Sequence, residues 1–222
     1  MDIRVYKSDI PNIDYNSTPS NVNNKKLLII VHRIVMKLRE KEFSLGDFDH
    51  LYLNLTTCLE SGAIEPAKRS VDRYHPWYRF YDVGVDESFY NALDTEQAVD
   101  KIIAILEEVL LQYFAENESE KEMIRESIRE AVTQKENMLM RFKVKETATR
   151  KAVVYMRWLD CLRYAPLLCV YDAEGNELLR KELALISDFD AFGTIQLSNK
   201  KVTIKPRTNV FTKHLKPISF EF

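Results

Sequence analysis

The chain has 222 residues, of which 45% are hydrophobic and 30% charged, so it can build an ordinary globular core without disulfide or metal staples. Its 32 basic and 34 acidic residues give a net charge of −2, which argues against a dedicated nucleic-acid-binding protein, because such proteins usually carry a basic excess. The three cysteines include no Cys-x-x-Cys pair, which favours a reducing compartment.

Targeting and membrane signals are the next features to consider. The N-terminal residues contain no apolar stretch of the signal-peptide type. No apolar run approaches the roughly 20 residues that a membrane-spanning helix needs. We therefore expect a cytoplasmic protein.

The first third of the chain contains a helix between candidate strands. Residues 3–6 fit a short strand, and residues 8–24, rich in Asn, Ser and Pro, fit a loop. Apolar residues recur every three or four positions in 25–41, which predicts a helix. Apolar and polar residues alternate in 51–56, and aromatic and β-branched residues fill 77–85, so both segments are predicted strands.

The middle of the chain carries the strongest helical pattern. A wide apolar stripe follows possible capping residues at 94–95 and predicts a helix that continues to residue 113. After a break near Asn117, a second helix is predicted to residue 134. Met138, Leu139 and Phe142 fit the same period, so this helix could extend through residues 135–146.

The last third reads mainly as antiparallel sheet. Residues 150–164 are densely apolar and could form either a helix or a strand, because periodicity does not separate the two in a buried run. Two hairpins and a last edge strand are predicted beyond them. The strands concerned are 167–171, 177–183, 194–197, 202–204 and 218–222.

Together these elements predict an α+β fold in which long amphipathic helices pack on a mainly antiparallel sheet. There is no internal repeat and no low-complexity linker, so a single composite domain over residues 1–222 is expected. The alternative is a boundary near residue 145, with a helix-rich part at 25–145 and a β-rich part at 146–222.

The segment 68–86, KRSVDRYHPWYRFYDVGVD, is the most informative part of the sequence. Aromatic residues dominate positions 74–81, and cations lie among and before them. Aromatic and arginine side chains are the usual energetic anchors of protein-binding surfaces. The residues that we expect to contact a partner are Arg69, Arg73, Trp77, Tyr78 and Arg79.

Three interpretations of this segment stay open. Strand alternation would place Trp77, Tyr81, Val83 and Val85 on one inward face, together with Arg79, which would then need a buried acidic partner. Alternatively, the segment exposes a protein-binding patch. Stacking of single-stranded nucleic acid on the rings is the third possibility, disfavoured by the acidic balance of the chain.

The acidic run at 116–122, ENESEKE, is a second candidate surface. Charged runs on helices are most often solvated faces. The competing hypothesis is an acidic surface that attracts a basic partner such as a nuclease toxin, since charge complementarity speeds association and sets specificity.

Signatures of catalysis, metals and cofactors are weak. No phosphate-binding loop, dinucleotide fingerprint or Gly-x-Ser-x-Gly elbow occurs. The four histidines are scattered, so neither a metal nor a cofactor is predicted; mid-helix His32 fits a structural role, and Cys161 and Cys169 fit inert core positions. The alternative is a metal-dependent hydrolase or nuclease, whose site would combine Asp72, His75, Asp82 and Asp86.

A resemblance to a known family spans roughly residues 48–185. The strand FDHLYLNLT is followed by a Gly-containing turn, then by KRSVDRYHPWYRFYDVGVD, FYNAL, a long amphipathic helix and RWLDCLRYAPLLCVYDAEGN. This order of features resembles immunity proteins of bacterial polymorphic toxin systems. The resemblance implies a small cytoplasmic, non-enzymatic protein that neutralises a cognate toxin domain by tight binding. We expect no membrane partner, and the charge balance disfavours nucleic acid as a partner. The resemblance implies no individual contact residues.

Overall fold

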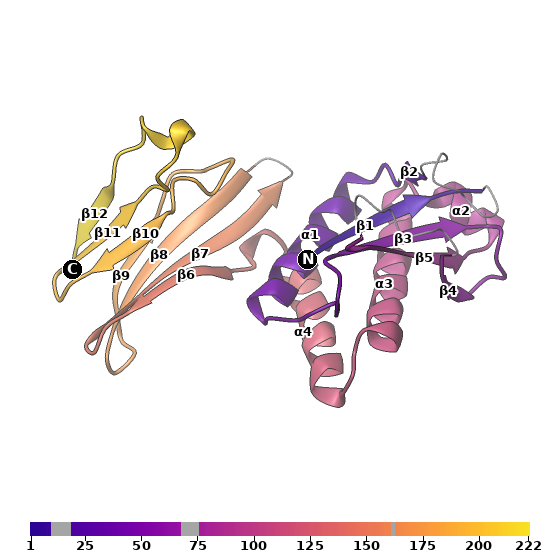
Figure 1. Ribbon diagram of the computed structural model, residues 1–222, viewed down its shortest axis with the longest axis horizontal. Helices are drawn as coiled ribbons and strands as arrows, with labels where there is room; N and C mark the ends of the chain where they lie inside the picture. Colours follow the sequence, from indigo (N-terminus) through magenta and orange to yellow (C-terminus); the bar gives the residue numbers. More distant parts are fainter. Residues whose placement is uncertain (10–18, 68–75, 161–162) are drawn as a thin grey trace. The chain divides into compact units, whose positions relative to one another are not determined.

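The computed structural model describes residues 1–9, 19–67, 76–160 and 163–222, except for the side chain of Phe211. The chain divides into two compact units, an N-terminal unit, Met1–Lys135, and a C-terminal unit, Glu136–Phe222 (Figure 1). Within the described ranges, no helix is both long and apolar enough to cross a membrane.

The N-terminal unit contains a five-stranded sheet with the order β2-β1-β3-β5-β4. The three central strands β1 (Asp2–Lys7), β3 (His50–Thr56) and β5 (Tyr78–Gly84) run parallel. The short edge strands β2 (Ser20–Asn21) and β4 (Ile64–Pro66) pair antiparallel to β1 and β5. The parallel pairing places Ile3 beside Leu51 and Leu51 beside Arg79, so the carboxyl ends of all three central strands meet at one edge.

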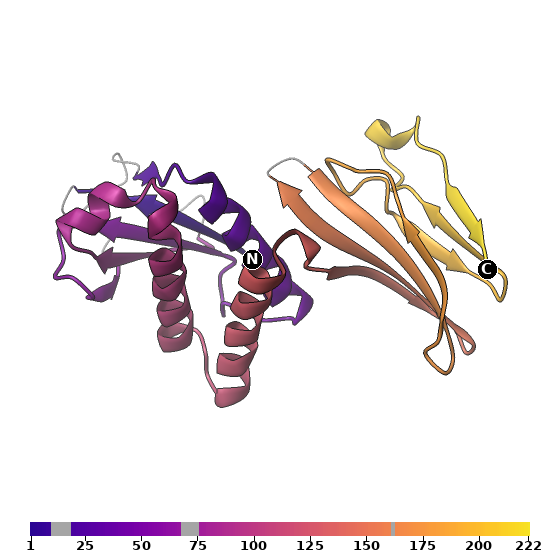
Figure 2. The same cartoon turned by 180° about the vertical axis from the view of Figure 1, so that it is seen from behind.

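Three longer helices and one short helix accompany this sheet. They are α1 (Lys25–Glu40), α2 (Glu87–Ala92), α3 (Val99–Tyr113) and α4 (Glu118–Gln134), with a 3-10 turn, η1 (Glu96–Ala98), before α3. At the helix starts, the Asn24 side chain accepts from Leu27 N and the Asn117 side chain accepts from Glu120 N. In both views α4 lies beside α3 and runs back along it (Figures 1 and 2).

The core of the N-terminal unit lies between the helices and one face of the sheet. Helix α1 contacts both β1 and α3, while Tyr113 of α3 packs against Tyr81 of β5 with ring centroids 4.9 Å apart. Because the strand period is two, alternate residues of each strand point to this face, and the aliphatic ones among them are buried. The buried aliphatic residues on the three strands are Ile3, Val5, Leu51, Leu53, Leu55 and Val83.

The predicted extension of α4 through residues 135–146 is wrong. The helix ends at Gln134, Lys135 has a φ of 51°, and a 3-10 turn, η2 (Lys135–Asn137), leads into strand β6 (Met140–Glu146). Met138 and Met140 are both buried, so the apolar residues here follow a period of two. The helical interpretation failed because three apolar residues in so short a segment fit either period.

The C-terminal unit consists of two antiparallel sheets. The four-stranded sheet has the order β6-β7-β8-β9 and the three-stranded sheet has the order β10-β11-β12. The described residues of the ambiguous segment 150–164 are all in strands: they form β7 and the start of β8. The bounds are β7 (Arg150–Asp160), β8 (Arg163–Asp172), β9 (Glu177–Glu182), β10 (Thr194–Leu197), β11 (Lys201–Lys205) and β12 (Ile218–Glu221), with a 3-10 turn η3 (Val210–Thr212).

Aromatic packing joins the four-stranded sheet to the chain that leads into β10. Phe142 stacks on Phe189 with centroids 4.8 Å apart, and Tyr164 contacts both Trp158 and Phe189. The predicted hairpins at 167–183 and 194–204 and the strand at 218–222 are confirmed.

The predicted α+β class is confirmed, and most strand pairs of the three sheets are antiparallel. The parallel centre of the N-terminal sheet was not predicted. The expectation of one composite domain stays a prediction.

Candidate partner-binding surface

Trp77 lies just before β5, at the end of the sheet where the parallel strands begin. Its carbonyl accepts hydrogen bonds from Asp49 N at 3.1 Å and from His50 N at 3.2 Å, which fix its backbone to the start of β3. Its side chain is 42% exposed. The expected inward position of Trp77 is therefore wrong, because strand pairing begins one residue later, with His50 opposite Tyr78.

Behind Trp77, the face of the sheet opposite the β3 leucines carries a set of packed rings, which we call the aromatic cluster: Tyr6, His50, Tyr52, Tyr78 and Phe80. Tyr52 is at its centre, with ring centroids 5.1 Å from Tyr78 and 4.8 Å from Phe80. The Trp77 ring meets Tyr78 edge-on at 6.1 Å. Tyr52 is only 5% exposed, and burial together with hydrogen bonding to Tyr78 raises the pKa of its hydroxyl.

Arg79 lies on the opposite face of β5 from Tyr78, as alternation requires. Its Nη1 donates to the carbonyls of Pro76 at 2.6 Å and Tyr78 at 3.0 Å, and its guanidinium carbon lies 5.0 Å from the Phe48 ring centroid. Its acidic partner is Asp47, with Nη2 3.4 Å from Oδ2. The prediction that Arg79 pairs with a buried acid is wrong, because the Asp47 side chain is 82% exposed. A surface ion pair of this kind is worth about 1 kcal/mol at most.

Of the five predicted contact residues, three are described: Trp77, Tyr78 and Arg79 follow one another at the start of β5, with Tyr78 and Arg79 on opposite faces of the sheet. Arg69 and Arg73 lie outside the described residues. Sequence reasoning missed His50 and Phe48, which join the same end of the sheet. The alternation in 51–56 set Tyr52 apart from the leucines, but nothing in the sequence indicated that β3 pairs with β5.

The residues of the alternative metal site do not form a cluster where they are described. Asn54 Nδ2 donates to Asp82 Oδ1 at 2.8 Å on the sheet face, while Asp86 is the N-cap of α2 and accepts from Phe89 N at 2.7 Å. Asp72 and His75 lie outside the described residues. Within the described part of the chain, no three His, Cys, Asp or Glu side chains are placed to hold a metal ion.

Asp86 is held in its charged form by its role as a cap. Hydrogen bonds from the Ser88 hydroxyl and the Phe89 amide, with the nearby ammonium of Lys101, lower the pKa of its carboxyl to about 2. A carboxylate in this state accepts hydrogen bonds and cannot donate a proton near neutral pH. This fits a structural role better than general acid catalysis.

The acidic run is explained largely by helix formation. Asn117 caps α4, and Glu118 and Glu120 lie in its first turn, where negative charge is favoured. Glu118 pairs with Lys121 at 2.6 Å, and Glu122 approaches Arg125 at 3.9 Å, each three residues ahead. These cations offset the acids, which favours the interpretation of a solvated helix start.

The described cysteines are unremarkable as nucleophiles. Cys169 is buried in β8, and burial raises the pKa of its thiol, so the reactive thiolate is disfavoured. Cys58 is exposed, and its sulfur lies 3.1 Å from the carbonyl oxygen of Asp9. Cys161 lies outside the described residues.

Comparison with known protein-family models, with curated proteins and with solved structures found no significant match.

Proposed function

We propose that this protein is a non-enzymatic binding protein that occludes a partner protein, a toxin domain, through the end of the sheet at which Trp77, Tyr78 and Arg79 lie. The inhibition is steric and needs no turnover, cofactor or metal. The resemblance of the sequence to immunity proteins suggests the class of partner. The exposed indole of Trp77 is the single observation that carries the choice of surface.

The support of Trp77 makes it a suitable anchor. Its carbonyl accepts hydrogen bonds from Asp49 N and from His50 N at the start of β3, which hold its backbone, and its ring meets Tyr78 of the aromatic cluster edge-on. A side chain on a backbone that is already ordered costs less entropy to bind. Arg79, beside it, is partly exposed and held by two backbone carbonyls. Tryptophan, tyrosine and arginine are the residue types that most often dominate the energy of an interface.

The test is co-expression of the protein with the product of the neighbouring gene. We expect the two chains to co-purify and the toxicity of the partner to be suppressed. Trp77→Ala and Arg79→Ala should each weaken binding by about 2 kcal/mol or more, roughly 30-fold, if they are interface anchors. Leu28→Ala, which truncates an exposed apolar side chain on α1, is the matched control and should leave binding unchanged.

Two results would count against the proposal. If no complex forms and no protection is seen, the binding function is wrong for this partner. If Glu122→Lys at the start of α4 abolishes binding while Trp77→Ala does not, the interface lies on the acidic helix and the assignment of contact residues is wrong.

A further inference from the structure

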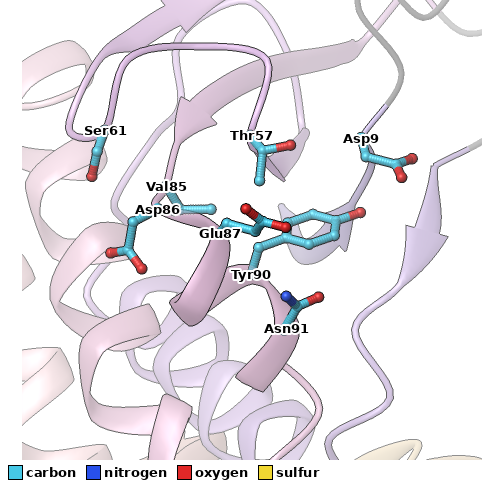
Figure 3. A pocket seen from close by; sticks show the side chains of 8 residues that line it. All are labelled: Asp9, Thr57, Ser61, Val85, Asp86, Glu87, Tyr90 and Asn91. Carbon is cyan, nitrogen blue, oxygen red and sulfur yellow. The ribbon is translucent and has the colours of Figure 1, made fainter.

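A cavity of about 440 Å³ opens at the carboxyl end of the parallel strands. It is lined by residues that directly follow these strands and by helix α2 (Figure 3). Asp9 comes soon after β1, Thr57 follows β3, and Val85 follows β5. The crevice outside the carboxyl ends of parallel strands is where open α/β sheets bind ligands, and the volume falls within the range of about 300–1,000 Å³ typical of small-molecule sites.

One wall of this cavity is held rigidly by the backbone. The loop after β3 crosses the end of β5: Gly62 N donates to Gly84 O at 2.9 Å, and Gly84 N donates to Ala63 O at 2.8 Å. A Cβ on Gly84 would lie 1.9 Å from the Glu60 carbonyl oxygen, so only glycine permits this approach. The loop therefore holds Thr57 and Ser61 in place beside the start of α2.

The other wall is one face of α2. Glu87, Tyr90 and Asn91 stand three and four residues apart and so project from the same side of the helix. In Figure 3 the Tyr90 ring lies among the lining side chains, with Asp9 and Asp86 on opposite sides of the view. The cavity thus combines carboxylates, hydroxyls, an amide and one aromatic ring.

The charge of the lining is one-sided. Three of the described lining residues, Asp9, Asp86 and Glu87, are acidic, and no lysine or arginine is among those described. Asp86 is partly compensated by the Lys101 ammonium at 3.3 Å. Among the described residues, the Asp9 and Glu87 carboxylates make no ion pair or hydrogen bond. Burial of Tyr90 and the nearby charge of Asp9 raise the pKa of its hydroxyl, so its ring stays neutral beside the carboxylates.

We propose that this cavity binds a small organic cation of the diamine or polyamine class. The two uncompensated carboxylates, Asp9 and Glu87, would each accept an ammonium group, and the Tyr90 ring would pack against the aliphatic chain. The hydroxyls of Thr57 and Ser61 would accept the remaining N–H groups. A polyamine carries two or more ammonium groups separated by apolar methylenes, and this arrangement of acids around a ring matches that pattern.

This site is independent of the partner-binding surface. The cavity follows the carboxyl end of β5, whereas Trp77 precedes its first residue, and a seven-residue strand separates two such points by about 20 Å. A failure of either proposal therefore leaves the other untouched.

The test uses the full-length protein and isothermal titration calorimetry with putrescine and spermidine. We expect saturable binding with one site per chain, weakened by added salt because the attraction is between charges. Asp9→Asn combined with Glu87→Gln should weaken binding about tenfold or more, as loss of a favourable charge pair does. Asn91→Lys, which adds a competing cation without removing an acid, should have the same effect.

The controls separate this site from general attraction of cations to an acidic protein. Glu122→Gln combined with Glu146→Gln removes the same charge at exposed positions elsewhere and should leave affinity unchanged. The proposal is overturned if both double variants lose the same amount of affinity, or if millimolar amine gives no heat of binding. It is also overturned if Mg²⁺ displaces spermidine as effectively as another amine does. Butane-1,4-diol, which has the length of putrescine without its charges, should not bind.

Discussion

Lys37 of α1 and Glu130 of α4 form an ion pair, with Nζ 3.0 Å from Oε2, that joins two helices separated by most of the N-terminal unit in sequence. The Lys37 side chain is only 10% exposed, and Glu40 also accepts from its ammonium at 2.8 Å. Burial alone would lower the pKa of Lys37, but these two carboxylates outweigh burial and raise it.

Removing this cation should destabilise the protein. Lys37→Met leaves Glu40 and Glu130 without their shared partner, and we expect the free energy of unfolding to fall by about 3 kcal/mol, as for other broken buried pairs. Urea unfolding followed by circular dichroism would measure it. Lys26→Met breaks the exposed Lys26–Glu96 pair and should cost less than about 1 kcal/mol. Adding Glu130→Leu to Lys37→Met should recover part of the loss; if it does not, the pair is not the cause.

His32 should make the protein sensitive to mild acid. Burial lowers its pKa from 6.5 to about 4, against the opposing effect of the Asp2 carboxylate and with a smaller contribution in the same direction from Arg39. Between these two values the unfolded chain binds more protons than the folded one, so stability falls as pH is lowered through this window. The loss of unfolding free energy due to His32 is at most about 3 kcal/mol, because each pKa unit corresponds to about 1.36 kcal/mol.

The measurement is urea unfolding at pH 7 and pH 5, above the range in which carboxylates such as Glu130 become protonated. Wild type should lose stability over this interval, and His32→Gln should lose clearly less. An unchanged pH slope in the variant would show that another group is responsible.

Gly84 should tolerate no side chain. Gly84→Ala forces a Cβ against the Glu60 carbonyl, so we expect a loss of about 3 kcal/mol in unfolding free energy or failure to fold. Gly62→Ala is the matched control in the same loop: its φ is +90° with open space around it, so only conformational strain of about 1–2 kcal/mol applies. A smaller loss at Gly84 than at Gly62 would contradict the close approach of the loop.

The aromatic residues should separate into core and surface by their effect on stability. Tyr52→Ala empties the centre of the aromatic cluster and should cost about 3–5 kcal/mol. Trp77→Ala removes an exposed ring and should shift the thermal midpoint far less, although it is the larger truncation. Thermal unfolding of the two variants side by side tests this ordering; equal losses would mean that Trp77 is a core residue and a poor candidate for partner contact.

Local patterns determined much of the secondary structure. The apolar stripes of α1 and α3 are strong because each helix buries one side along its length, and the alternation of leucines in β3 follows the strand period of two. Asn24 and Asn117 fixed two helix starts through single side-chain hydrogen bonds. These features depend on neighbours within a few residues, so they can be inferred from the chain alone.

The tertiary structure decided what no local pattern contains. Whether Trp77 points inward depends on where β5 begins to pair with β3, a contact between segments that are far apart in the chain. The acidic cavity exists only because three parallel strands end at one edge, bringing Asp9 and Thr57 beside Glu87. Residue types along the sequence indicated a binding protein with aromatic and charged anchors; strand pairing determined which of those residues share a surface, because it is set by packing across the whole sheet.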